Sequence, residues 1–539
     1  MRAELIVIGQ VLVAAVPRAP ERAEAIGIAG GRVVAVGSTD EVRASAAAGA
    51  RVLDAGAAAV VPGLHDFHIH LVGLARTRSG VALDGAVDGA EVVRRLAEHA
   101  ERLPSGAWLT GRGWSEAQLA GVTPDELEAA VAGRAAFVTS HDGHSAWASE
   151  RARQHAGVTT STPDPAGGRI ERDPHGEPTG LLREAALDLV AASVPRLQGA
   201  GLRPLLDSTL RELAAHGLTG ASEAGDYTDE SGTGADAELG DSYSTLTDLG
   251  DLVDGRLRMN LGIPVDAIDA ARERDLRTGA PLKDRATLRF GWAKEYSDGA
   301  IGSGTAALFQ PHTCGDGDTG ILRVSAEELD ASFRAGRSAG IALAVHAIGD
   351  RAAATVLDAV ARAPQRTART PNDRIEHAQL LRAADRARFA PLGLTASIQP
   401  IHAAADRDLV EACWDGRQAD AYAWRALLDA GALLAAGSDA PVESVNPWLG
   451  IFAALHRRFP SDERPDWRSE QALTVLEALH AYTLAPALAI EAADEGHLRV
   501  GARADVAVLS VGLDALLSAE VDFAAVRSDL TIVDGRPLG

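Results

Sequence analysis

Along the middle of this chain, apolar, strand-like runs alternate repeatedly with stretches of helical period, and this pattern limits the possible folds. The helical stretches, such as residues 325–340 and 469–485, are rich in Ala, Leu, Arg and Glu. The candidate strands lie at 59–70, 218–225, 256–265, 288–299, 342–350, 374–381, 394–402 and 433–442. Alternation of this kind predicts an α/β fold in which eight parallel strands close into a (β/α)8 TIM barrel.

Length and composition fit one large barrel with additions. The 539 residues are 46% hydrophobic and 24% charged, so a sizeable core is available. The formal net charge of −23 argues against nucleic acid and an anionic membrane as partners, because both favour a basic face. No run reaches the roughly 18 to 20 apolar residues of a membrane helix. We therefore expect a small molecule as the partner, and we consider a homodimer.

The two ends of the chain differ in sequence pattern from the middle. Residues 1–57 and 487–539 consist of short β-rich runs with Gly punctuation. We expect these ends to form one small β-sandwich domain beside a barrel of residues 58–486. Residues 75–200 exceed what one crossover needs, which predicts an insertion that lies over the barrel mouth and selects the substrate.

The number and spacing of the cysteines indicate the redox state of the cellular compartment. The chain has only Cys314 and Cys413, and neither has a CxxC neighbour. They could pair, but two free thiols in a reducing compartment is the simpler interpretation. We therefore expect a cytoplasmic protein.

Side chains of metal-ligand type end four of the candidate strands. His68 and His70 are two residues apart, so both imidazoles can face one side of a strand. With 16 histidines in the chain, such a pair arises by chance roughly 0.5 times, so it is weak evidence alone. His346, His377 and Asp439 end three further strands. A single strand-end histidine is more often structural, but the five side chains together predict a metal site with N and O ligands.

Lys294 is unusual because almost every basic residue of this chain is an arginine. Among 52 basic residues, the only other lysine is Lys283. A buried salt bridge to Glu295 or Asp298 is one explanation, although Arg would serve equally well there. A lysine, unlike an arginine, can lose its proton when desolvated and add CO2 to form a carbamate. Such a carbamate could bridge two metal ions.

Six motifs in strand order resemble those of the amidohydrolase superfamily: VVPGLHDFHIH, KEYSDG, VHAIGD, IEHAQ, IQPIH and AGSDAPV. They are particularly similar to the amidohydrolase-3, YtcJ-like group, which includes N-substituted formamide deformylases. The terminal runs GGRVVAVG and GHLRVGARADVAVLSVG, and the inner segments SHDGHSAW and GEPTGLLRE, are similar as well. The resemblance covers nearly the whole chain, and it is specific for the family but not for the substrate.

The resemblance implies a binuclear centre. Its ligands would be His68, His70 and Asp439 for the more buried ion, His346 and His377 for the second, and the Lys294 carbamate as bridge. Two zinc ions per chain are expected, with manganese, iron and nickel as alternatives. His65 departs from the family pattern and is either a donor that supports a ligand or a tolerated variant. Asp66 matches the family and is expected to support a loop or a ligand.

The implied activity is hydrolysis of a non-peptide carbon–nitrogen bond (EC 3.5) in an amide, such as an N-acyl or N-formyl amine. Asp439 would take a proton from metal-activated water and return it to the leaving amine. The outer substrate pocket is assigned to His141, His144, His402 and Trp292, with His144 and His402 also as catalytic donors.

Three alternatives stay open. One is a mononuclear hydrolase of the same superfamily, of deaminase or cyclic-amide type, in which Lys294 is not a ligand. Another is a catalytically inactive barrel that serves in assembly or binding. The third is a lyase that uses Lys294 to form a Schiff base.

Overall fold

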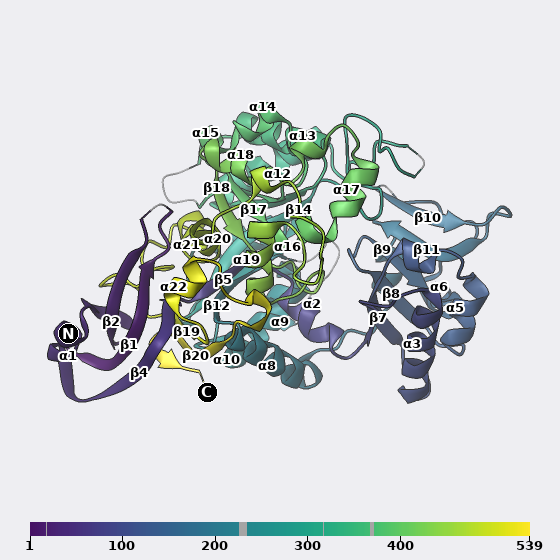
Figure 1. Cartoon of the computed structure of the whole chain (residues 1–539). Coiled ribbons are helices and arrows are strands. Elements are labelled where there is room, and N and C mark those ends of the chain that lie inside the picture. Colours follow the sequence, from purple (N-terminus) through teal and green to yellow (C-terminus); the bar gives the residue numbers. More distant parts are fainter. Residues whose placement is uncertain (18, 166, 226–233, 316, 367–370, 539) are drawn as a thin grey trace.

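Eight parallel strands form the centre of the computed structural model, which describes residues 1–538 except 18, 166, 226–233, 316 and 367–370 (Figure 1). In sheet order they are β5 (Leu64–Ile69), β12 (Leu218–Glu223), β13 (Arg258–Pro264), β14 (Leu288–Tyr296), β15 (Leu343–Ala347), β16 (Arg374–His377), β17 (Thr395–Ile398) and β18 (Leu433–Ala436). Backbone bonds join the first and last strands, since Asp439 N donates to His68 O and His70 N donates to Ala440 O. The predicted barrel is confirmed, and each predicted run contains one barrel strand, although residues 59–62 of the first run belong to β4 (Ala46–Pro62).

Helix α12 (Ala326–Ala339), between β14 and β15, shows why the connections between barrel strands are helical. Ser325 and Glu328 make a reciprocal capping box at its start, and Gly340 ends it with a left-handed φ of 70°. Leu329 and Phe333, four residues apart, are buried on its inner face. Helix α13 (Asp350–Arg362), which follows β15, buries Val356, Leu357 and Val360. The amphipathic helices thus cover a barrel whose strands are buried on both faces.

The remaining connections of the barrel carry further helices. These include α2 (Leu71–Thr77), α8 (Gly199–Ala215), α9 (Asp241–Asp248), α11 (Ile268–Glu273), α16 (Pro400–Ala405), α17 (Arg407–Cys413), α18 (Trp424–Asp429), α19 (Pro447–His456), α20 (Val475–Tyr482) and α21 (Leu484–Ala489). None of the helices in the described ranges combines the length and apolar character needed to cross a bilayer.

Both ends of the chain enter one seven-stranded sheet on one flank of the barrel (Figure 1). Its order is β21 (Arg536–Pro537), β20 (Ser528–Val533), β19 (Val506–Leu509), β4 (Ala46–Pro62), β1 (Ala3–Ala14), β2 (Glu21–Ala29) and β3 (Arg32–Gly37). Gly30 and Gly31 join β2 to β3 with φ values of 56° and 75°, as a tight hairpin requires.

The segment predicted as an insertion forms a mixed sheet on the opposite flank, with its own apolar core (Figure 1). Its strands are β6 (Val81–Ala82), β7 (Leu109–Trp114), β8 (Ala136–Ser140), β9 (Ser145–Ala148), β10 (Gly168–Arg172) and β11 (Pro178–Glu184). Its helices are α3 (Gly89–Arg102), α4 (Glu116–Leu119), α5 (Pro124–Ala130), α6 (Glu150–Ala156) and α7 (Asp188–Ala191).

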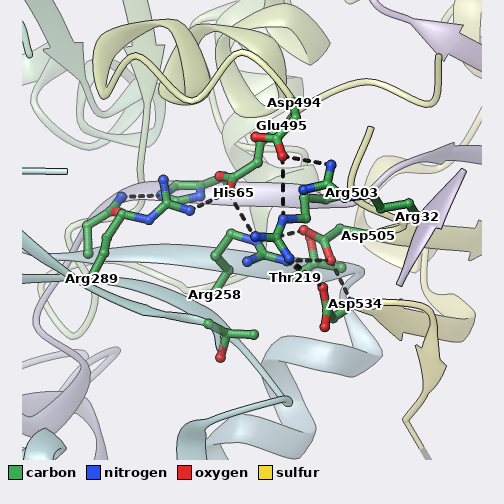
Figure 2. Close-up of polar contacts among 12 residues, drawn as sticks. Arg32, His65, Thr219, Arg258, Arg289, Asp494, Glu495, Arg503, Asp505 and Asp534 are labelled. Atoms are coloured by element: carbon green, nitrogen blue, oxygen red, sulfur yellow. Dashed lines mark hydrogen bonds and ion pairs between the residues drawn. The ribbon is translucent and has the colours of Figure 1, made fainter. Parts of the chain in front are cut away.

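An ion-pair network fixes the C-terminal segment to the barrel (Figure 2). Arg258, on β13, is buried and lies 2.8 Å from Asp505 and 3.6 Å from Asp534. Arg289, on β14, pairs with Glu495. Because removal of one partner would leave a buried charge, this network fixes how the C-terminal segment docks.

The two cysteines are a correction to the sequence analysis. Cys314 and Cys413 form a disulfide, so the expected free thiols are wrong. The loop after β14 folds back onto the end of α17, where Thr313 N donates to Cys413 O at 2.9 Å. The pairing therefore depends on a tertiary contact across 99 residues of sequence. The cytoplasmic expectation loses the support that it drew from free thiols.

Candidate metal centre and active site

Asp439 lies just beyond β18, at the centre of a cluster of four histidines: His68, His70, His377 and His402. Its Oδ1 is 3.2 Å from His68 Nε2 and 3.3 Å from His70 Nε2. Its Oδ2 is 3.6 Å from His402 Nε2 and 4.0 Å from His377 Nδ1. His68, His70 and Asp439 form one group, and His377, His402 and Asp439 form a second. Within each group the potential ligand atoms lie within 4.8 Å of one another, so one carboxylate serves two adjacent groups that could each hold a metal ion.

Several buried polar atoms around Asp439 lack a hydrogen bond. Within the described ranges, His377 Nδ1, His402 Nε2 and Lys294 Nζ have no hydrogen-bond partner. Buried imidazole nitrogens without partners are costly unless a cation or another donor satisfies them. The donor set of imidazoles and one carboxylate therefore fits divalent ions such as zinc.

Glu376 supports His68, and the sequence analysis missed it. Glu376 Oε2 lies 2.5 Å from His68 Nδ1, and its Oε1 lies 2.5 Å from Arg374 Nε. Although burial would raise it, Arg374 and His68 hold the pKa of Glu376 well below its usual range. The carboxylate thus occupies Nδ1 and leaves Nε2 of His68 directed at Asp439, as in carboxylate–histidine–metal triads. Its signal in the sequence was a charged pair, Arg374 and Glu376, inside a buried strand.

Lys294 stands in the barrel interior with its side chain 1% exposed. Neither Glu295 nor Asp298 pairs with it, because Glu295 bonds Tyr296 N and Ser332, and Asp298 accepts three backbone N–H groups. The salt-bridge explanation is therefore wrong. Burial lowers the pKa of Lys294 to about 8, although Glu376 and Asp439 act in the other direction.

His346 lies beside the second set of candidate ligand atoms but does not belong to it. Its ring is 4.6 Å from that of His377, centre to centre, so the two sites adjoin. However, His346 Nε2 donates to the carbonyl of Gly299 at 3.2 Å, and His402 instead joins His377 and Asp439 in the second set of ligand atoms. The assignment of His346 as a ligand stays a prediction, with His402 as a competing candidate.

The backbone of the site is strained at two of its candidate ligands. Asp439 and His377 have left-handed φ values of 60° and 69°, which non-glycine residues adopt at a cost of about 1–3 kcal/mol. Asp66 accepts from Ser438 N at 2.9 Å and His68 N at 3.2 Å, and so ties the Asp439 loop to β5. A Cβ at Gly437 would come within 2.3 Å of His68 N, so the close approach requires glycine. Asp66 thus supports the loop, as predicted.

The insertion contributes His144 to the cluster. Its ring lies 5.3 Å from that of His346, and its Nδ1 lies 3.0 Å from Glu184 Oε2. Although burial opposes it, Glu184 raises the pKa of His144, which favours the imidazolium form. Since Glu184 occupies Nδ1, Nε2 is the nitrogen that can donate to a substrate.

His141 has both ring nitrogens engaged. It bonds Asp84 of the insertion at 2.9 Å and Glu443 of the barrel at 3.1 Å. Burial opposes protonation, but these two partners raise the pKa of His141 to about 10. His141 therefore fastens the insertion to the barrel mouth, and it contributes to the pocket through its ring. Glu443, which sequence analysis missed, completes this contact.

Trp292 requires a correction. It precedes Lys294 by two residues and so lies one layer deeper in the barrel, where it is 1% exposed. Its Nε1 donates to Asn372 O at 2.8 Å, and the Arg374 guanidinium lies 4.3 Å from its ring. Of the described cavities at the mouth, neither is lined by Trp292. The structure therefore contradicts its assignment to the substrate pocket.

His65 also lies away from the cluster, near the N-terminal end of β5. Figure 2 shows it beside the ion-pair network of Arg258 and Arg289. Its Nε2 is 3.0 Å from Ser222 Oγ, and burial with Arg289 nearby lowers its pKa to about 3. His65 is thus part of the barrel floor and supports no ligand among the described residues.

A barrel that gathers histidines and an aspartate at the C-terminal ends of its strands defines a site for one or two divalent cations. Residues 51–538 match the amidohydrolase family, so the chain belongs to this family of hydrolases. It is 29% identical over 530 residues to the "Putative amidohydrolase YtcJ" of Bacillus subtilis (strain 168), with 96% of each chain covered.

Two further comparisons agree with this family. The chain is 29% identical to the N-substituted formamide deformylase of Arthrobacter pascens, with 90% of each chain covered. Its fold is similar to that of an uncharacterized metal-dependent hydrolase from Pyrococcus horikoshii OT3, with a TM-score of 0.75, 24% identity, and 97% and 99% of the chains covered.

Proposed function

We propose that this protein is a metal-dependent amidohydrolase that cleaves the C–N bond of an N-acyl or N-formyl amine. The observation that carries the proposal is Asp439, whose two oxygens each face a different pair of histidines. The similarity to an N-substituted formamide deformylase supports an amide as the bond that is cleaved.

The centre would hold two ions, with zinc as the expected metal. His68, His70 and Asp439 would bind one ion, and Asp439 with His377 and either His402 or His346 would bind the second. Lys294, which has no hydrogen bond to another described residue, would join them as a carbamate. Divalent ions in such a site lower the pKa of water and polarise a carbonyl oxygen.

The protein's own groups would move the protons. Burial would raise the pKa of Asp439, but His68 and His70 hold it well below its usual range, so the carboxylate is ionised. Asp439 would therefore accept the proton of the attacking water and deliver it to the leaving amine. His144, as an imidazolium on Glu184, would donate to the developing negative charge.

A hydrolysis screen of the metal-loaded protein against N-formyl, N-acetyl and aryl amides tests this proposal. We expect turnover of at least one amide and about two metal ions per chain by elemental analysis. One ion per chain with turnover would favour the mononuclear, deaminase-type alternative. No turnover of any amide by fully loaded protein would contradict the proposed function.

A further inference from the structure

Two cavities meet at the candidate centre. We name them by their walls: chamber A, of about 220 Å³, is lined by Trp114, Ala117, Ile301 and Leu409 among others. Chamber B, of about 410 Å³, is lined by Thr77, Thr110, Phe137, Thr139 and Val194 among others. The residues that line both are Asp142, His144, His346, His377, Asp439 and Val442.

The shared residues place the reacting bond at the junction of the chambers. Asp439, His377 and His144 all belong to the shared wall, so a bond held between them has one chamber on each side. A formyl group is not much larger than a water molecule, whose share of liquid volume is about 30 Å³. Each chamber therefore has room for a group of several non-hydrogen atoms.

The charges of the two chambers differ in sign. Chamber A alone is lined by three carboxylates, Glu116, Asp406 and Glu443, and by one imidazolium, His141. Chamber B alone is lined by the guanidinium groups of Arg76 and Arg112, and also by Lys294, which the proposed function makes a carbamate. Several are paired, since Glu116 binds Arg183, Glu443 binds His141, Arg76 binds Asp241 and Arg112 lies 3.5 Å from Asp84.

Asp406 is the carboxylate of chamber A with the least cationic support. It is partly buried, and Tyr422 donates its hydroxyl to it. A substrate cation beside it would pair with this partly desolvated carboxylate.

We infer that the substrate is an amide with substantial groups on both sides of the scissile bond, with its amine half in chamber A and its acyl half in chamber B. Hydrolysis breaks the C–N bond, forms a C–O bond with water, and yields a carboxylate and an ammonium ion. The ammonium then lies among carboxylates and the carboxylate lies near cations. The inference rests on the proposed function and excludes a formyl group as the preferred acyl half.

Three amides and two variants test the inference. The amides are N-benzylformamide, N-benzylhexanamide and N-methylhexanamide. For the parent, we expect kcat/KM to rise at least about tenfold from the formamide to N-benzylhexanamide, because methylenes gain apolar contacts. Thr139→Trp, which fills chamber B, should lower kcat/KM for N-benzylhexanamide more than for the formamide. Ala117→Trp, which fills chamber A, should lower it more for N-benzylhexanamide than for N-methylhexanamide.

Calorimetry supplies a readout that does not depend on turnover. Hexanoate and benzylammonium should bind the parent together, while Thr139→Trp weakens hexanoate binding and Ala117→Trp weakens benzylammonium binding. The milder Thr139→Leu and Ala117→Leu variants should show the same pattern at smaller size. Equal or better hydrolysis of the formamide, or mutually exclusive binding of the two products, would overturn the two-chamber assignment alone. Absence of hydrolysis of all three amides would overturn the proposed function and, with it, this inference.

Discussion

Removal of the Lys294 amine should stabilise the metal-free protein. The side chain is 1% exposed and lacks a hydrogen bond to any described residue, so its charge is poorly solvated when no metal or CO2 is present. Lys294→Met keeps a side chain of similar length and removes the amine. The thioether therefore fills the same space without the cost of a buried cation.

The size of the effect follows from the pKa of Lys294. Burial lowers it from an ordinary 10.5 to about 8. At 1.36 kcal/mol for each factor of ten, the protonated amine costs the folded state about 3 kcal/mol at pH 7. Between pH 8 and 10.5 the unfolded chain binds more protons than the folded one, so the stability of the parent rises with pH through this window. The Lys294→Met variant lacks this rise.

Denaturant unfolding of metal-free protein in CO2-free buffer measures the difference. We expect Lys294→Met to exceed the parent by about 3 kcal/mol at pH 7, and the gap to close as the pH approaches 10.5. Lys283, the only other lysine, is exposed and provides the matched control, so Lys283→Met should change little at either pH. If Lys294→Met is no more stable than the parent at pH 7, or if the gap does not depend on pH, the reasoning is refuted.

Five further substitutions, at four positions, test the centre. Lys294→Arg and Lys294→Ala should both be inactive, with acetate or propionate restoring only the Ala form; an active Arg form would exclude the carbamate. Asp439→Asn should keep the fold and lower turnover by about 10² to 10⁴, and a loss below about threefold would exclude its role as base. Glu376→Gln should weaken metal binding by about 10- to 100-fold in a chelator competition, and an unchanged Kd would contradict its support of His68. His144→Ala should change the ranking of amide substrates at constant metal content, whereas a loss of metal would make His144 a ligand.

The barrel and the clustering of its central candidate ligands could be predicted because both follow from local pattern. Strand alternation places His68 and His70 together, and a carboxylate after an apolar run, such as Asp439, requires a partner in the fold. Parallel strands in a barrel then bring these ends to one mouth. The distance of Asp439 from His68 and His70 agrees with that expectation.

Features that depend on depth or on tertiary contact could not be predicted in this way. Trp292 shares a strand with Lys294, but only the layer it occupies shows that it packs in the floor. The disulfide joins two segments that no local pattern brings together. Glu376 directly precedes a candidate ligand, yet its role depends on a contact with a strand more than 300 residues away.

The place of β4 in the terminal sheet has a consequence for biosynthesis. Val60–Pro62 pair with Val506–Val508 on one side, while β1 covers the other. About 440 residues separate β4 from β19, so the ribosome must add the whole barrel before the edge of β4 that faces β19 is covered. At roughly 5–20 residues per second, this edge stays open for tens of seconds on the nascent chain. The terminal domain therefore completes its folding only after the barrel has been synthesised, and β4 is the segment that a chaperone would need to shield until then.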